Sequence, residues 1–395
     1  MTEHHTADDL TEAAPDLTVT AEPFTRLGPE AAHRLGPERT ALWSVDRALF
    51  HPEVFRARRP DGTLAAAALV TARRGTAYRK IVDIWCAPEP DQDNRPADAR
   101  VFDDEAFGAV LDAVVAAQAP EALALKFEER PAILTLWPEA LAALAARGFV
   151  PDPQPVHSVE STLGGVRGWT RWASRPPRST VAYYGQTTDV TCGAVAALMA
   201  LETDGAAMLW PVDHAHNRTV EIELWRTATN MPAIEPVGLA VAIARAAAER
   251  KVPFALPRVH LSAPSPVLLE WYDGDDFQLR AELQAESARQ ADALGIEVRR
   301  DWLDADGIVR EIEAGNFVFL LIDLTLMIND PTPHWVLAHD VIDGTVVIDD
   351  PWVEREHGET WVDTHHLPVP LASIDEMTRW GEPAYRGVVV VPRGA

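Results

Sequence analysis

Two residue types are scarce in this sequence, and long apolar runs are missing. The 395 residues include two cysteines, Cys86 and Cys192, which stand far apart. This pair excludes a disulfide scaffold and a cysteine-rich zinc site. No stretch of 18 consecutive apolar residues occurs, so we expect no transmembrane helix. The first residues also show no basic-then-apolar signal pattern, and we therefore expect a cytoplasmic, reducing location.

Lysine is the second scarce residue. Lys80, Lys126 and Lys251 are the only lysines. The sequence has 35 basic and 60 acidic residues, which gives a formal net charge of −25. A field this negative disfavours binding to nucleic acid or to an anionic membrane, so we expect neither partner. The hydrophobic share of 47% is ordinary for a globular chain. The length favours two domains.

The first half of the chain has the pattern of an α/β domain. Residues 1–20 are polar and acidic, and we expect them to be disordered. Over residues 21–165 the pattern predicts alternating strands and helices, with strands at Val54–Arg58, Leu64–Ala72, Ile81–Cys86, Leu123–Phe127 and Ser158–Leu163 and helices at Glu30–Phe50, Asp104–Ala117 and Pro138–Arg147. Segment 166–180 contains tryptophans and a proline pair without clear periodicity, and we interpret it as a linker.

The second half, residues 181–395, has helices first and strands afterwards, which is typical of an α+β fold. Apolar periodicity predicts the helices, at Thr191–Leu201, Glu221–Thr229, Pro236–Glu249 and Gly307–Ala314. Short apolar runs of the kind buried in a sheet follow, at Phe317–Asp323, His334–Ala338, Thr345–Ile348 and Gly387–Val391.

Cys192 is the first candidate for chemistry. It follows the loop Tyr183–Thr191 and begins an alanine-rich helix. The positive end of a helix lowers the pKa of a thiol, and the first amides of the helix donate to an oxyanion. Gln186, six residues earlier, brings a side-chain amide to the same place, and Gly193 permits close backbone approach. The alternative is a buried structural cysteine, because free cysteines are often buried.

A histidine and an acid follow in the order that nucleophilic catalysis uses. His334 begins a strand after a proline-bearing loop, and a hairpin return sets Asp350, 16 residues later, behind its imidazole. The histidine takes the thiol proton, and the acid fixes the histidine tautomer. His339 faces the opposite way from His334 on a strand, so we prefer His334. Asp349 replaces Asp350 if the register slips by one residue.

Several other residues are candidates for substrate binding, for a structural role or for metal binding. Asp189, Gly193 and Trp335 are candidate substrate-binding residues because they flank the proposed nucleophile and base. Cys86 lies in an apolar run and is expected to be buried. The histidines at 365 and 366, with His357 and Asp363 nearby, include metal-ligand types, but no further cluster completes a site. We expect no metal and no organic cofactor.

These motifs carry a resemblance to a known family. The segments QTTDVTCGAVAALMA, PHWVLAHDV and VVIDDPW, with DTHHLPVPLASIDEMTRWG near the end, look like papain-like peptidases that remove double-glycine leaders from bacteriocin precursors. The likeness covers residues 183–391 and is to a stand-alone branch that lacks a membrane transporter and often carries an acetyltransferase-like domain. It implies a papain-like fold and four catalytic residues, namely Cys192 as nucleophile, His334 as base, Asp350 as third member and Gln186 as oxyanion donor.

The N-terminal half resembles the GNAT acetyltransferase fold in its order of elements. The resemblance implies that IVDIWCAPE is the central strand and that the following loop binds the pyrophosphate of acetyl-CoA through backbone amides. Here that loop, Pro88–Val101, has no glycine, several acids and prolines that remove donors. We therefore expect a degenerate domain without acetyltransferase activity, which recognises substrate or supports the other half.

The leading hypothesis is a cysteine-nucleophile hydrolase that cleaves a peptide or small amide through a thioester. One alternative is an acyl or aminoacyl transferase that uses the same residues, and another is a non-catalytic binding protein. The segment Asn230–Pro236 stands where the family resemblance implies glycines, so the family's substrate is not carried over to this chain.

Overall fold

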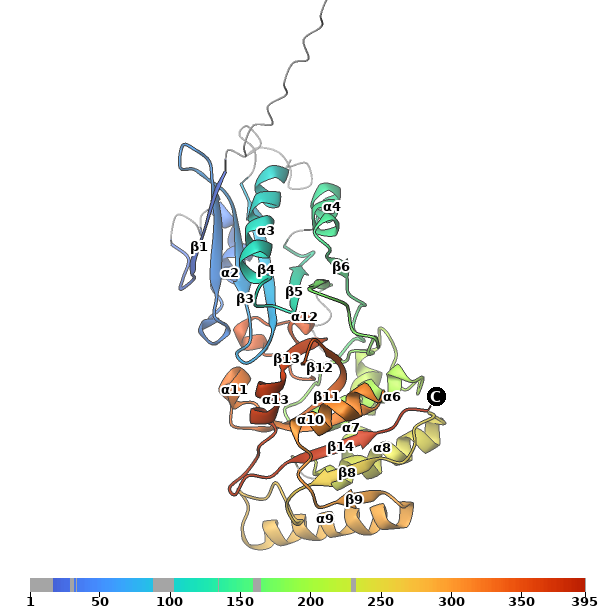
Figure 1. Ribbon diagram of the computed structural model, residues 1–395. Coiled ribbons are helices and arrows are strands. Elements are labelled where there is room, and N and C mark those ends of the chain that lie inside the picture. The colour runs from blue at the N-terminus through green and yellow to red at the C-terminus, as the bar shows by residue number, and fades with distance from the viewer. Residues whose placement is uncertain are drawn as a thin grey trace, which may run out of the picture.

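The computed structural model describes residues 17–28, 32, 34–87, 103–133, 135–158, 165–228 and 232–394. In these residues the chain forms two sheets of seven strands each. Figure 1 shows the two sheets one above the other, with the short helix α12 (Trp361–Thr364) between them. The chain is thus an α+β protein with a sheet in each half, as the sequence predicts.

The N-terminal sheet is antiparallel except for one pair. In spatial order its strands are β1 (Thr18–Pro23), β2 (Glu53–Arg58), β3 (Leu64–Thr71), β4 (Tyr78–Cys86), β5 (Ala124–Glu129), β7 (Arg167–Trp172) and β6 (Val150–Pro151). β4 and β5 are parallel, and α3 (Asp104–Gln118) connects them. This is the order of elements that the GNAT resemblance implies.

Both faces of the N-terminal sheet are covered. Alternate strand residues point to opposite faces, so Phe55 packs with α3 and α4 (Pro138–Ala146) on one side. Its neighbour Val54 packs with Trp43 of α2 (Pro37–Trp43) on the other. Because helices lie on both sides, β3 is buried over almost its whole length. Its sequence is accordingly a nearly continuous run of small apolar residues.

The C-terminal sheet is also antiparallel except for its last pair, β8 with β9. In spatial order its strands are β13 (Leu367–Pro370), β12 (Thr345–Asp349), β11 (Pro333–Ile342), β10 (Phe317–Asp323), β14 (Gly387–Val391), β8 (Arg258–Leu261) and β9 (Glu297–Arg299). β11 and β12 are joined by a tight hairpin, whose register shifts between Ala338 and Asp340. This hairpin holds several of the candidate residues.

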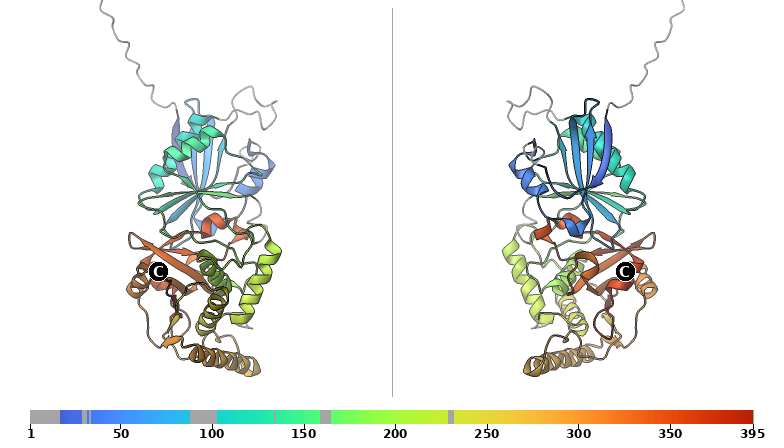
Figure 2. Two further views of the ribbon diagram at one scale, coloured as in Figure 1. Left: turned by 90° about the vertical axis from the view of Figure 1, so that its right-hand side faces the viewer. Right: turned by 90° about the vertical axis from the view of Figure 1, so that its left-hand side faces the viewer.

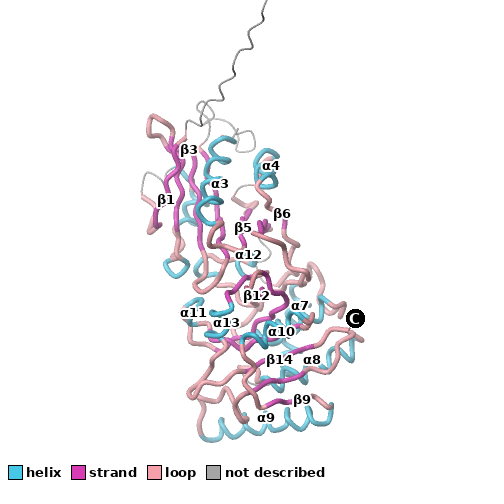
Figure 3. The backbone as a smooth tube through the Cα atoms, viewed as in Figure 1, coloured by secondary structure: helices cyan, strands magenta, loops and turns pink. Residues whose placement is uncertain are grey.

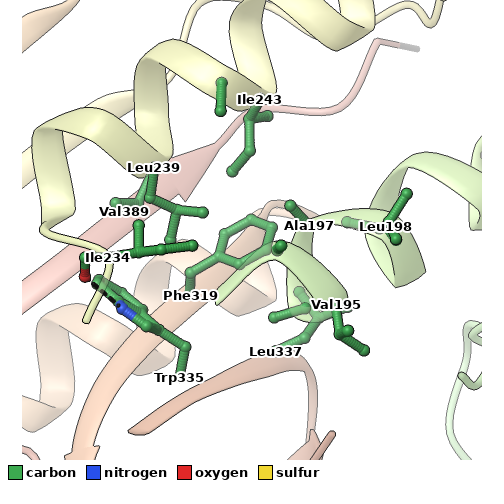
Figure 4. Packing of buried hydrophobic residues seen from close by; sticks show 14 of the residues in the cluster. Val195, Ala197, Leu198, Ile234, Leu239, Ile243, Phe319, Trp335, Leu337 and Val389 are labelled. Atoms are coloured by element: carbon green, nitrogen blue, oxygen red, sulfur yellow. Dashed lines mark hydrogen bonds between the residues drawn. The ribbon is translucent and has the colours of Figure 1, made fainter. Parts of the chain in front are cut away.

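Helices lie on both faces of the C-terminal sheet (Figure 3). One face packs against α6 (Cys192–Thr203), α7 (His214–Ala228) and α8 (Pro236–Arg250), with α9 (Gly274–Leu294) behind α8. On this face Phe319 and Val389 of the sheet meet Ala197 and Ile243 of the helices (Figure 4). The other face packs against α10 (Ala305–Glu313), α11 (Thr325–Ile328) and α13 (Leu371–Met377).

The two halves share a buried junction, which both side views of Figure 2 show between the sheets. Phe50 and Tyr78 of the first half belong to the apolar cluster on the second sheet. The amide of Ala77 donates to the carbonyl of Pro368 at 2.8 Å. Lys126 Nζ donates to the carbonyls of Val362 and His365 at 2.7 and 2.6 Å. The two domains are thus connected both by apolar packing and by buried hydrogen bonds.

Four boundaries predicted from the sequence need correction. Segment 166–180 is not all linker, because Arg167–Trp172 forms β7 and pairs with β5. Part of the expected disordered tail forms β1, whereas residues 1–16 lie outside the described residues. α7 begins at His214, seven residues before the predicted helix start at Glu221. α9 begins at Gly274, in a part of the chain where the sequence analysis predicts no helix.

Two further predictions lie largely outside the described residues. The strand expected at Ser158–Leu163 is described only at Ser158, and the loop Pro88–Val101 is not described.

Candidate active site

Cys192 is the first residue of α6 and is almost completely buried, with 7% of its surface exposed. α6 is apolar on all sides because it packs between β11 and the other helices. At Gly193 a Cβ atom would lie 3.0 Å from Trp335 Cδ1 and 3.2 Å from Ile234 Cδ1. Glycine there lets the helix start sit close against β11, with the thiol at its positive end.

His334 and Asp350 meet at the mouth of the β11–β12 hairpin. His334 Nε2 lies 2.6 Å from Asp350 Oδ1, and both side chains are buried. The same carboxylate oxygen accepts from the amide of Trp352 at 2.8 Å. Because Nε2 faces the acid, Nδ1 is the ring nitrogen left for Cys192, with which the imidazole also interacts. The three side chains therefore form a continuous row.

The charges in this row favour an ion pair. Burial alone would lower the pKa of His334, but the Asp350 carboxylate and then Cys192 outweigh it and raise the pKa to about 10. Burial would raise the pKa of Asp350, yet His334 and Arg73 lower it to about 2. The imidazole is consequently held protonated beside the Asp350 carboxylate at neutral pH.

Gln186 lies in a loop that neighbouring groups hold firmly. Its backbone amide donates to the carbonyl of Pro351 at 2.9 Å, next to Asp350. Its side-chain Nε2 donates to the carbonyl of Thr188 at 2.8 Å, and the side chain is buried. One N–H of the amide group therefore remains for a further acceptor.

A residue that the sequence did not single out, Glu221 of α7, anchors the same loop. Its carboxylate accepts from Thr187 N at 2.9 Å, Thr187 Oγ1 at 2.8 Å and Tyr184 Oη at 2.9 Å. Thr191, directly before Cys192, also donates to it. Burial raises the pKa of Glu221, although these donors oppose the shift. Nothing in its local sequence distinguishes Glu221 from an ordinary helix residue.

A cavity of about 220 Å³ opens beside the thiol. Its lining is mostly apolar and includes Asp189, Cys192, Ile234, Leu268, Trp271 and Trp335. The structure thus brings two of the three candidate substrate-binding residues, Asp189 and Trp335, to the wall of a cavity that contains Cys192. Gly193 lies against the same tryptophan.

The second residue that sequence reasoning missed comes from the other domain. Arg73, which follows β3, is buried and donates through Nη1 to Asp350 Oδ2. Its Nε lies 2.6 Å from Glu359 Oε1, and its Nη2 donates to the carbonyl of Trp352 at 2.9 Å. Burial would lower the pKa of Arg73, but Glu359 and Asp350 raise it well above its usual value. The N-terminal domain therefore places a fixed positive charge on the candidate acid.

The alternative residues pair with each other instead of with His334. Asp349 Oδ1 accepts from His365 Nδ1 at 2.6 Å, and Asp349 Oδ2 lies 3.0 Å from His339 Nε2. Cys86 is buried in β4, and burial raises the pKa of its thiol. The geometry thus separates the preferred residues from their alternatives.

The space between β4 and β5 in the N-terminal domain is largely filled. Arg39 Nε and Trp43 Nε1 both donate to Asp83 Oδ2, at 2.9 and 2.8 Å. The cavity that remains beside Asp83 has a volume of about 10 Å³, which is room for about one water molecule.

Comparison with known protein families finds a match for the second half of the chain. The family described as DUF3335: Peptidase_C39 like family matches residues 181–392. That match spans more than half of the chain. The chain belongs to the Peptidase_C39 like family. The expected relationship to a papain-like peptidase family is thereby confirmed, and the family membership supports an enzyme. No curated protein matches the chain.

The solved structures similar to part of this Peptidase_C39 like chain include three acetyltransferases. Nourseothricin acetyltransferase has a TM-score of 0.21 and 17% identity over 31% of this chain and 65% of its own. A spermidine N-acetyltransferase SpeG chimera from Vibrio cholerae and hSSAT has a TM-score of 0.27 and 12% identity over 40% and 97%. A putative phosphinothricin N-acetyltransferase has a TM-score of 0.24 and 10% identity, over 40% of this chain and 100% of its own.

Among the described residues of this Peptidase_C39 like chain, the helices are too short or too polar for any of them to cross a bilayer.

Proposed function

We propose that this protein is a cysteine-nucleophile hydrolase that cleaves a peptide or amide bond. Cys192 is the nucleophile, His334 the acid–base group and Asp350 the residue that orients it. The observation that carries the proposal is the row in which His334 bonds Asp350 through Nε2 and meets Cys192 at the start of α6. The family match supports a peptidase class without specifying the bond.

In the first step, the Cys192 thiolate attacks the substrate carbonyl carbon and forms a C–S bond. The carbonyl oxygen takes up the negative charge, and protonated His334 then gives its proton to the departing amine nitrogen. The C–N bond breaks, the amine leaves, and a thioester remains on Cys192. Asp350 keeps Nδ1 directed at the reacting atoms because it holds Nε2 at 2.6 Å.

In the second step, neutral His334 removes a proton from water, and the oxygen of this water attacks the thioester carbonyl. The C–S bond breaks, the carboxylic acid leaves, and the proton returns the site to its thiolate–imidazolium form. Water and amide are the only reactants, so the reaction needs no oxidant or reductant.

Two kinds of donor stabilise the oxyanion in both steps. The backbone amides at the start of α6 point out of the helix without partners inside it. The free N–H of the Gln186 side chain is the second donor, and Glu221 fixes the loop that carries it. A rigid loop matters here because donors that are already in place need no reorganisation during the reaction.

The cavity beside Cys192 favours a substrate with an apolar side chain near the cleaved bond. Ile234, Leu268, Trp271 and Trp335 supply apolar surface, and Asp189 supplies one acid at the edge. We propose that the N-terminal domain supports this site instead of transferring acetyl groups, because Arg73 holds Asp350 in place.

The proposal is tested with a peptide library derived from a proteome, incubated with the full chain. New termini are identified by mass spectrometry. We expect cleavage next to a preferred apolar residue, and we expect it to disappear in the Cys192→Ala variant. Equal cleavage by the folded Cys192→Ala variant would contradict the proposal.

A further inference from the structure

A second cluster of ionisable side chains lies buried behind the proposed catalytic acid. His339 belongs to β11, Asp349 ends β12, and His365 and His366 stand between α12 and β13. One ligand atom each from His339, Asp349 and His366 all lie within 4.8 Å of one another. The fold of the sheet creates this cluster, since the sequence places its members up to 27 positions apart.

Hydrogen bonds satisfy only part of the cluster. Asp349 Oδ1 accepts from His365 Nδ1 at 2.6 Å and from the amide of His366 at 2.9 Å. Asp349 Oδ2 lies 3.0 Å from His339 Nε2. Within the described residues, however, neither of these two atoms has a partner with hydrogen-bond alignment. The pair therefore has the distance of an ion pair but not the direction of a hydrogen bond.

Other ring nitrogens are also left over. Among the described groups, His339 Nδ1, His365 Nε2 and His366 Nε2 are buried without a hydrogen-bond partner. The side chains of His339 and Asp349 are completely buried, and His366 is 9% exposed. A buried polar atom without a partner destabilises the folded chain. His339, Asp349 and His366 each contribute an atom to a group within 4.8 Å, and unpaired buried polar side chains gathered in this way indicate a missing ligand.

The donor set selects the kind of ligand. Two imidazole nitrogens and one carboxylate oxygen suit Zn²⁺ and similar divalent transition metals, whereas Ca²⁺ and Mg²⁺ prefer oxygen ligands. We propose that His339, Asp349 and His366 bind one such ion, with Zn²⁺ the best fit. Bonds of about 2.0–2.2 Å draw the three side chains closer by about 1 Å. His365 orients the carboxylate through its hydrogen bond to Oδ1.

The position of the cluster gives the ion a structural role. It links β11, β12 and the segment before β13, and it fixes Asp349 beside Asp350. The carbonyl of His365 accepts from Lys126 of the N-terminal domain, so the same link reaches the domain junction. Since the ligands are buried, the ion stabilises the fold and takes no part in the cleavage step.

The test measures the metal content of the untagged full chain in a Cys192→Ser background, so that the thiol binds no metal. After chelator treatment and addition of Zn²⁺, elemental analysis after desalting is expected to give close to one ion per chain. Co²⁺ is expected to give visible d–d absorption bands, and Zn²⁺ to raise the melting temperature of the metal-free chain.

The variants His339→Ala and His366→Ala are expected to reduce the bound Zn²⁺ at least about tenfold. His260→Ala is the matched control, because His260 is also buried and paired with a carboxylate, that of Asp301. It is expected to retain the ion. A folded chain that takes up neither Zn²⁺ nor Co²⁺ would overturn the proposal, whatever the variants do. Full metal content in both cluster variants would also overturn it.

Discussion

Two histidine–aspartate pairs lie on the same β11–β12 hairpin, and their surroundings differ. His334 pairs with Asp350, and its second ring nitrogen faces Cys192. His339 lies beside Asp349, and its second nitrogen has no partner among the described residues. Consecutive residues of an extended segment point in opposite directions, so neighbouring acids serve two different sites. In the proposed function, the partner of the second ring nitrogen distinguishes the reactive pair from the other one.

The strongest test of this difference is removal of the nucleophile. Cys192→Ala is expected to lower kcat by at least about 10⁴-fold, because no thioester forms. The free energy of unfolding is expected to change little, since alanine fits the small apolar site. The measurement is steady-state cleavage of a peptide from the library screen. Cys86→Ala, in a buried strand of the other domain, is the matched control and is expected to leave kcat within about twofold.

The next test compares the two neighbouring acids. Asp350→Asn is expected to lower kcat by about 10²–10⁴-fold, because the amide no longer stabilises the imidazolium form of His334. Asp349→Asn is expected to keep kcat within about tenfold and to lower stability instead, since it replaces the buried carboxylate beside His339 and His365 with a neutral amide. Kinetics and urea unfolding of both variants check this. Equal kinetic losses in both variants would break the comparison.

Arg73 tests whether the N-terminal domain belongs to the site. Arg73→Met leaves two carboxylates buried without their cation, and the expected loss of stability is about 3–5 kcal/mol. Among folded molecules we also expect kcat to fall about tenfold or more. Arg73→Lys keeps the positive charge and is expected to recover part of the stability and part of kcat. A kcat unchanged in Arg73→Met would mean that Arg73 supports only the fold.

The last test concerns the pH dependence of stability. The pKa of His334 rises from 6.5 to about 10 on folding. Its stabilising effect is therefore complete below about pH 6.5 and is lost as the pH rises toward 10. The pKa of Asp350 falls from 3.8 to about 2, so its contribution is present above about pH 4 and is lost toward pH 2.

Urea unfolding at pH 6, 8 and 10 checks whether the stabilising effect of His334 decreases as the pH rises. The free energy of unfolding of the unmodified chain is expected to decline more steeply over this range than that of His334→Ala. Parallel curves would show that His334 is not held protonated by its neighbours.

The contact between His334 and Asp350 could be predicted from the sequence because its signals are local. Cys192 precedes an alanine-rich helix, and His334 and Asp350 stand at the two ends of one hairpin, so their spacing predicts their meeting. Arg73 and Glu221 were not predictable. Arg73 contacts Asp350 across 277 positions, and Glu221 acts through a loop on another element.

Two elements of the fold were missed for physical reasons. In β7 the outward residues are basic or aromatic and the buried ones are Gly168 and Thr170, so the alternation of hydrophobicity is weak. In α9 the buried residues are Gln284 and Ala291, which gives almost no apolar stripe. Both elements form because neighbouring parts of the chain pair with them.

The most direct test of the central claim is the pH dependence of Cys192 alkylation by iodoacetamide, with Cys86 in the same molecule as the internal control. Mass spectrometry of the folded chain gives both rates. We expect fast labelling of Cys192 at pH 6, slower labelling in His334→Ala, and little labelling of buried Cys86. Labelling of Cys192 that follows an ordinary thiol pKa of about 8.5, unchanged in His334→Ala, would contradict an activated nucleophile.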